Sequence, residues 1–102
     1  MIARVWRGET RADVADAYAA YLERTGAAEC RGTPGNRGVQ VLRRVVADHA
    51  QFVFISLWES WDAIRTFAGT DVEVAHYYPE DKAFLLWLEP NVEHYEVLAG
   101  AT

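Results

Sequence analysis

The sequence predicts an α+β domain in which one antiparallel sheet is covered by a layer of helices. Four segments have the two-residue side-chain period, or the unbroken apolar run, that is typical of β-strands. Between the first and second strands, and again between the third and fourth, apolar residues recur at helical spacing. The expected order is therefore β-α-β-β-α-β, the ferredoxin-like plan, within a single domain that spans residues 1–102.

The first strand is expected over residues 2–7, where Arg4 and Trp6 lie on the same face. The second strand is expected over residues 38–46, and a hairpin turn at residues 47–51 leads into the third. Because this turn is short, the second and third strands are expected to pair antiparallel.

A helix is expected after the first strand, with Thr10 near its N-terminus and Gly26 at its end. Its apolar stripe consists of Val14, Ala17, Tyr18, Tyr21, Leu22 and Thr25. We expect the two tyrosines to pack on the sheet while their hydroxyls reach water. Residues 27–36 then read as a loop, because glycine and proline interrupt them. This loop precedes a strand and lacks the Gly-Lys-Ser/Thr ending, which disfavours a phosphate-binding role.

The third strand, residues 52–58, is apolar on both faces. A strand of this kind must be covered on both sides. One helical layer covers one side, and a chain of 102 residues has little left for the other. The sequence therefore predicts a homodimer in which the uncovered faces of two sheets meet.

Ser60 reads as the N-cap of a short helix that ends at Gly69. Residues 81–90 are compatible with a short strand or with one helical turn. The last strand is expected over residues 92–98, beside the first strand, so that His94 shares a face with Arg4 and Trp6.

A second short helix is expected over residues 70–78, immediately before Pro79. It would begin with a capping box at Thr70, because a glutamate follows three residues later. Val72, Ala75 and His76 would then share one face at helical spacing. His76 is accordingly expected to point towards the element on which this helix packs.

Composition and charge exclude several classes of protein. The net charge of −5, without a basic cluster, argues against a nucleic-acid partner. No apolar stretch reaches the length of a membrane span, so no membrane partner is expected. Cys30 is the single cysteine, which argues against a disulfide framework and favours a cytoplasmic location.

Four segments together resemble a known family. They are residues 34–38 (PGNRG), 57–61 (LWESW), 71–81 (DVEVAHYYPED) and 92–97 (VEHYEV). In this order and spacing they resemble the antibiotic biosynthesis monooxygenase superfamily of dimeric α+β barrels. The resemblance implies two sheets paired face to face, and a ligand site between the helices and the sheet of each subunit.

The same resemblance implies two kinds of activity. One branch of the superfamily consists of cofactor-free oxygenases of phenols, quinols and anthrones. Another degrades haem, using an asparagine at the end of the first strand, a tryptophan on the second helix and a histidine that ligates iron. His76 matches that histidine, but the first strand ends at Trp6 and Arg7, and the tryptophan position falls at or next to Phe67. The match thus favours an oxygenase, with haem binding left open.

A cofactor-free oxygenase needs an apolar pocket and a base at the phenolic oxygen of its substrate. His76 is the candidate base, since histidine changes charge near neutral pH. The candidate substrate-binding residues are Arg4, Trp6, Trp58, Trp61, Phe67, Tyr77 and His94. We expect a small aromatic molecule as partner, and no cofactor. A metal is not expected because His76 and His94 have no nearby cysteine or paired carboxylate at ligand spacing.

Structural alternatives stand beside each of these assignments. His76 can be a core histidine bonded to a carbonyl, and His94 can complete a dimer interface. Aromatic residues at these periods are often core. Arg4 and Glu96 can form a buried cross-strand pair. At the level of function, the alternative to a monooxygenase is a non-catalytic barrel that binds a small molecule, haem included.

Overall fold

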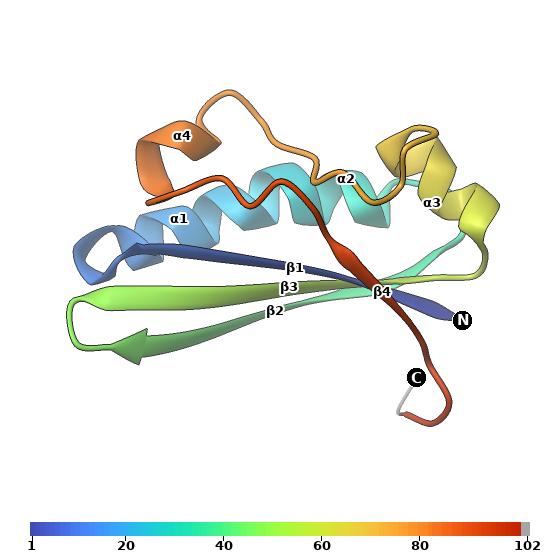
Figure 1. Cartoon of the computed structure of the whole chain (residues 1–102), viewed down its shortest axis with the longest axis horizontal. Coiled ribbons are helices and arrows are strands. Elements are labelled where there is room, and N and C mark those ends of the chain that lie inside the picture. Colours follow the sequence, from blue (N-terminus) through green and yellow to red (C-terminus); the bar gives the residue numbers. More distant parts are fainter. Residues whose placement is uncertain (101–102) are drawn as a thin grey trace.

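A four-stranded antiparallel sheet forms one layer of the molecule, and the labelled helices all lie on one of its faces (Figure 1). The computed structural model describes residues 1–100. The strands are β1 (Ile2–Arg11), β2 (Asn36–Val46), β3 (His49–Trp58) and β4 (Glu93–Glu96). Their order in the sheet is β2-β3-β1-β4, and every pairing is antiparallel. The predicted ferredoxin-like α+β class is confirmed.

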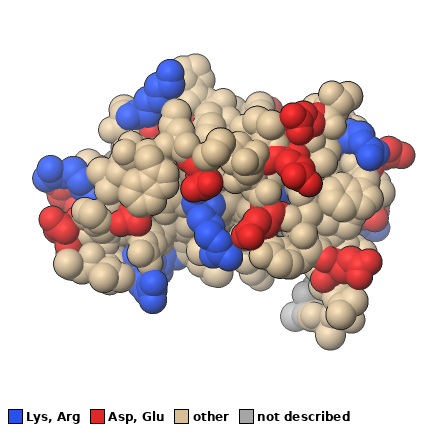
Figure 2. Space-filling model, viewed as in Figure 1, with Lys and Arg blue, Asp and Glu red and all other residues tan. Residues whose placement is uncertain are grey.

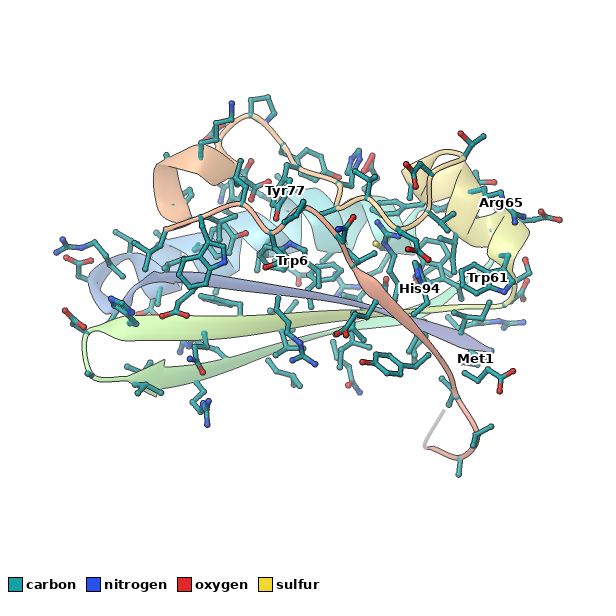
Figure 3. All side chains as sticks on the ribbon, viewed as in Figure 1. Met1, Trp6, Trp61, Arg65, Tyr77 and His94 are labelled. Carbon is teal, nitrogen blue, oxygen red and sulfur yellow. The ribbon has the colours of Figure 1, made fainter. Side chains whose placement is uncertain are left out.

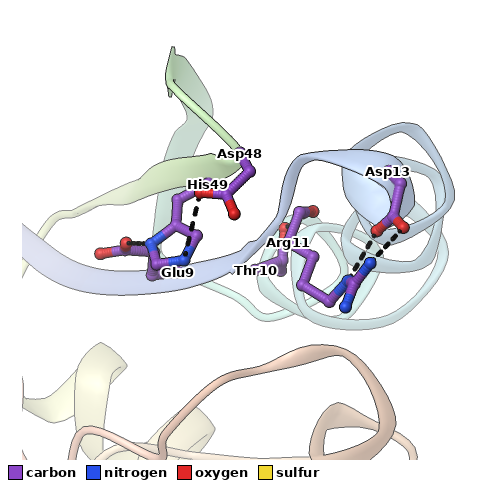
Figure 4. A network of polar contacts seen from close by, with 6 residues as sticks. All are labelled: Glu9, Thr10, Arg11, Asp13, Asp48 and His49. Carbon is purple, nitrogen blue, oxygen red and sulfur yellow. Dashed lines mark hydrogen bonds and ion pairs between the residues drawn. The ribbon is translucent and has the colours of Figure 1, made fainter.

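The first strand is longer than predicted and continues to Arg11, which lies opposite His49. Its last residues are polar and lack the alternation of a strand, so only their pairing with β3 makes them extended. The hairpin turn is also shorter than predicted. A network of polar contacts joins the end of β1 to this hairpin (Figure 4), with His49 Nδ1 2.7 Å from Glu9 Oε1. The Ala12 N–H donates to the Asp48 carbonyl over 2.7 Å.

The first helical segment does not end at Gly26, as the sequence suggested. It runs through a 3₁₀ turn (Ala12–Val14), α1 (Ala15–Leu22), a π-helical turn (Glu23–Ala27) and α2 (Ala28–Arg31). Gly26 lies under β3, where an added Cβ would be 3.6 Å from the Phe54 ring. Ala27 and Cys30 are fully buried. The helix therefore continues because its next turn packs on the sheet, which shortens the predicted loop.

The next helix, α3 (Trp61–Ala68), has the predicted ends. The Ala63 N–H donates to Ser60 Oγ over 3.2 Å, so Ser60 is the N-cap. Gly69 follows the helix with φ of 87°, a conformation that glycine adopts without strain.

The predicted second helix over residues 70–78 is wrong. Residues 71–74 form a turn in which the Val74 N–H donates to the Asp71 carbonyl over 3.3 Å, and residues 75–78 have no regular secondary structure. We call residues 70–80 the cover segment. It pairs with the chain before β4: the Ala75 N–H donates to the Pro90 carbonyl over 2.9 Å, and the Val92 N–H to the Glu73 carbonyl over 2.8 Å. These long-range bonds take the place of helical ones, so the cover segment is not helical despite its capping box.

The last ambiguous segment contains α4 (Asp81–Phe84) and then runs along the free edge of β1. Leu85 forms an isolated bridge with Thr10, and the Leu86 N–H donates to the Glu9 carbonyl over 2.9 Å. The segment thus covers the half of β1 that the short strand β4 does not reach.

The two faces of the sheet differ. The face under the helices carries the core, where Phe52 and Trp58 are almost fully buried. On the opposite face, which we call the open face, lie the alternate residues of β3, among them Ile55. Most of its residues are apolar, although it also carries Arg7, Arg44 and Glu93, and no helix within residues 1–100 covers it. Leu42 and Tyr95 are 49% and 50% exposed there.

Two surface properties complete the description. No helix within residues 1–100 is long and apolar enough to cross a membrane. Acidic and basic side chains are interspersed on the face seen in Figure 2.

Candidate functional site

A cavity of about 50 Å³ lies between the helical layer and the covered face of the sheet. The residues that line it are Arg4, Trp6, Tyr18, Leu22, Thr25, Gly26, Phe54, Ser56, Phe67, His76, Tyr77, Tyr78, Asp81 and Val92. The predicted base and four predicted substrate-binding residues are thus brought together here: His76, Arg4, Trp6, Phe67 and Tyr77. The site is formed by β1, β3, the first helical segment, α3, the cover segment, the start of α4 and Val92 before β4.

His76 lies at the rim of the cavity, with its side chain 38% exposed. It reaches this position from the irregular part of the cover segment rather than from a helix. Its ring centroid is 5.3 Å from that of Phe67 and 5.1 Å from that of Tyr78, which it meets edge-on. Its Nε2 is 3.4 Å from Glu29 Oε2. A carboxylate next to an imidazole can orient the ring.

Glu29 also accepts a hydrogen bond from the Tyr78 hydroxyl. Burial raises the pKa of Tyr78, and this hydrogen bond raises it further. The hydroxyl is therefore a donor at neutral pH. Glu29 was not predicted as a site residue, because it lies in the segment that was expected to be a loop.

Trp6 and Tyr77 form the aromatic wall next to the sheet, where both side chains point into the space between β1 and the cover segment (Figure 3). Their rings meet edge-on, with centroids 6.1 Å apart. The Trp6 indole N–H donates to the Tyr77 hydroxyl over 3.0 Å, and this hydroxyl donates to the Glu89 carbonyl over 2.6 Å. Gly8 leaves room for the indole, since a Cβ there would lie 2.1 Å from a Trp6 ring atom.

Arg4 enters the cavity from β1 and is only 4% exposed. It donates hydrogen bonds to the Val72 carbonyl and, over 3.0 Å, to the Val74 carbonyl. The predicted pair with Glu96 does not form, because His94 faces Arg4 across the strands and Glu96 lies opposite Ile2. Burial lowers the pKa of Arg4, although an arginine remains charged at neutral pH.

A buried carboxylate, Asp81, faces the cavity from the start of α4. The Tyr18 hydroxyl donates to it over 3.0 Å, and the Tyr78 N–H donates to it over 2.7 Å. The expectation that the Tyr18 hydroxyl reaches water is wrong, since Tyr18 is fully buried. Burial raises its pKa, and Asp81 raises it further. Asp81 was not predicted as a site residue, although its place in the segment that carries the family resemblance could have identified it.

The other three predicted substrate-binding residues, Trp58, Trp61 and His94, do not line this cavity. Trp58 is fully buried behind Phe67, with ring centroids 5.5 Å apart. Trp61 is 43% exposed and packs against His94 (Figure 3), with ring centroids 4.9 Å apart and ring planes tilted by 59°. His94 Nε2 is 3.3 Å from the Arg4 guanidinium, so it contacts a lining residue from behind.

The cavity as it stands is small. A typical small-molecule site has ~300 Å³ or more, whereas this one has about 50 Å³. It therefore does not fit a haem, and an aromatic ring needs more room than this cavity offers. Within residues 1–100, no cluster of three or more His, Cys, Asp or Glu side chains is placed to hold a metal ion.

The chain is similar to known proteins in sequence and in structure. A profile of the antibiotic biosynthesis monooxygenase family matches residues 1–76. A candidate antibiotic biosynthesis monooxygenase from Bacillus cereus has a similar structure, with a TM-score of 0.65 and 16% identity over 100% of this chain and 95% of that one. No curated protein matches the sequence significantly.

A second similar structure is the haem degrader MhuD from Mycobacterium tuberculosis, with two haems bound in its active site. Its TM-score is 0.61 and its identity 18%, over 100% of both chains. A mutant of MhuD with two manganese protoporphyrin IX molecules per active site gives a TM-score of 0.58. At these identities the likeness concerns the fold. The profile match covers most of the chain, and the chain belongs to the antibiotic biosynthesis monooxygenase family.

Proposed function

We propose that this protein is a cofactor-independent monooxygenase that acts on a phenolic or polyketide-type aromatic molecule. The observation that carries the proposal is the His76–Glu29 pair at the rim of an aromatic-lined cavity, with 3.4 Å between Nε2 and Oε2. Family membership supports it. The proposal includes a cytoplasmic location, which the single buried cysteine supports and which cell fractionation tests.

In the proposed reaction, the substrate supplies all the electrons. His76 takes the proton of a phenolic or enolic oxygen, and the resulting anion reduces O₂ directly. When a ring CH₂ becomes C=O, the carbon loses four electrons, one oxygen atom enters the product and the other leaves as water. Neither a metal nor a flavin is required for this balance.

Residues around the base have supporting roles in this proposal. Glu29, whose Oε2 lies 3.4 Å from Nε2, orients the imidazole. Trp6, Phe67 and Tyr77 offer ring faces and edges to a flat substrate. The cover segment closes over the substrate and excludes water, which protects a reactive anion from side reactions.

Oxygen uptake tests the proposal. Purified protein is mixed with a panel of hydroquinones and anthrones, and O₂ consumption is compared with the uncatalysed rate of each compound. We expect saturable uptake with at least one member and one O₂ consumed per product. Saturable binding without turnover across the panel would instead favour a non-catalytic binding protein.

Haem binding is the second candidate, because the similar protein MhuD holds haem and because His76 lies at the cavity rim. The small cavity argues for weak binding at most. Hemin titration should therefore show no saturating Soret band at micromolar concentration. A tight Soret complex that is lost in His76→Ala, together with reductant-driven loss of the haem spectrum, would reverse this ranking.

We also propose that two chains pair through their open faces. The support is an apolar sheet face that no helix covers. Light scattering at micromolar concentration should give a dimer with an interface of at least ~1,000 Å² in total. Ile55→Glu places a charge at the centre of the open face and should yield monomers, whereas Val45→Glu, on the other face of the sheet, should remain dimeric. A monomeric wild-type protein would contradict the proposal.

A further inference from the structure

The guanidinium of Arg4 is a buried positive charge without an acidic partner. Its side chain is 4% exposed, and its three hydrogen-bonding contacts are the Val72 carbonyl, the Val74 carbonyl at 3.0 Å and His94 Nε2 at 3.3 Å. Within residues 1–100, no carboxylate lies within ion-pair distance of it, although nine other such pairs are formed. All of its acceptors are thus neutral groups.

The histidine beside Arg4 does not offset the charge. His94 must present a lone pair on Nε2 to act as acceptor, so its proton is on Nδ1. Burial lowers the pKa of His94, and the positive charge of Arg4 lowers it further. The ring is therefore neutral at neutral pH, and the guanidinium keeps its full charge.

The other charged group of the cavity is already bonded. Asp81 lines the same cavity, but its two oxygens accept hydrogen bonds from the Tyr18 hydroxyl and the Tyr78 N–H. No ion pair joins it to Arg4 among the described residues. The cavity thus has a cationic wall at Arg4 that no side chain neutralises.

Burying an unpaired charge is costly, and an anion bound beside it recovers part of that cost. A guanidinium has five N–H donors, and the contacts above occupy three of them. Planar carboxylates and phenolates suit the remaining donors. The Phe67 ring lies 5.9 Å from the guanidinium carbon, so an aromatic group has an apolar surface next to the charge.

We infer that Arg4 binds an anionic oxygen carried by an aromatic ligand, as a carboxylate or a phenolate. The substrate class of this site is therefore an aromatic acid, or a phenol that is held as its phenolate once His76 has taken its proton, rather than a neutral hydrocarbon or ester. Calling this ligand a substrate rests on the proposed function. The inference itself concerns binding and holds whether or not turnover follows.

The test compares matched ligands on the wild-type protein by calorimetry under nitrogen. One pair is a hydroxynaphthoic acid and its methyl ester, and the other is an electron-poor dinitronaphthol, ionised at neutral pH, and its methyl ether. We expect the anion of at least one pair to bind about tenfold tighter than its neutral analogue. Preference in the first pair identifies a carboxylate, and in the second a phenolate.

Variants connect this preference to one residue. Arg4→Met removes the charge and should bring the affinity for the anion down to that of the neutral analogue. Arg65→Met removes an exposed charge from α3, on a side chain that points away from the cavity (Figure 3), and should keep the preference. If Arg4→Met does not fold, Arg4→Lys retains the charge and should keep a reduced preference.

Equal affinity within both pairs, no binding of any of the four ligands, or an unchanged preference in folded Arg4→Met would overturn the inference. These results are independent of oxygen uptake. A protein that prefers anions but consumes no O₂ keeps the inference and loses the proposed function. One that oxidises phenols without any anion preference does the reverse.

Discussion

His76→Ala is expected to lower turnover of the best substrate in the oxygen-uptake panel by about a hundredfold or more, the lower end for general-base catalysis. The melting temperature should change little, because the side chain is 38% exposed and surface substitutions cost ~0.5 kcal/mol or less. The measurement is O₂ uptake and thermal unfolding on the same preparation.

His49→Ala is the matched control for this prediction. His49 also contacts a carboxylate, with Nδ1 2.7 Å from Glu9 Oε1, but it lies at the β2–β3 hairpin, outside the residues that line the cavity. Its replacement should leave turnover unchanged. His76→Phe keeps the ring contacts with Phe67 and Tyr78 but no base. Full turnover in a folded His76→Phe protein would remove His76 from the site.

Trp58→Ala is expected to destabilise the protein by about 3–5 kcal/mol, the range for deleting a large buried aromatic side chain. Trp58 is fully buried, and its indole N–H donates to Ser56 Oγ over 2.8 Å. For a domain of this size, the loss corresponds to a decrease in melting temperature of at least ~12 °C. Thermal unfolding followed by circular dichroism measures it.

Trp58→Ala should also alter the cavity, because Trp58 packs behind Phe67 and Phe67 contacts His76. Trp58→Phe keeps an aromatic ring and should recover part of the lost stability. Trp61→Ala, at a residue that is 43% exposed, is the control and should cost less than ~1 kcal/mol. A Trp58→Ala protein as stable as the control would show that the core repacks to fill the space left by the indole.

Local sequence determined the strands and the ends of one helix. The period of two in β3 places Phe52 and Trp58 under the helices and Ile55 on the open face, because successive side chains of a strand point to opposite faces. Ser60 and Gly69 end α3 through a side-chain cap and a positive φ, both of which involve only neighbouring residues.

The candidate site was partly predictable for the same reason. Arg4 and Trp6 are two residues apart on β1 and share its inner face, which the sequence indicates. Phe67 lies on the apolar side of α3. Glu29 and Asp81 were not identified as lining or contacting the site. Tyr18 and Asp81 are 63 residues apart, and only the packing of the first helical segment against α4 brings them into contact.

Tertiary structure overruled local sequence where long-range contacts compete with local ones. The helix continues past Gly26 because Ala27 and Cys30 are buried beyond it, whereas in isolation a glycine favours an end. The cover segment has the capping box of a helix, yet Arg4 binds two of its carbonyls and the chain before β4 pairs with its backbone. The sequence by itself indicated that His76 faces inward. These bonds come from distant residues, however, so only the tertiary structure decided the backbone conformation from which His76 reaches the cavity.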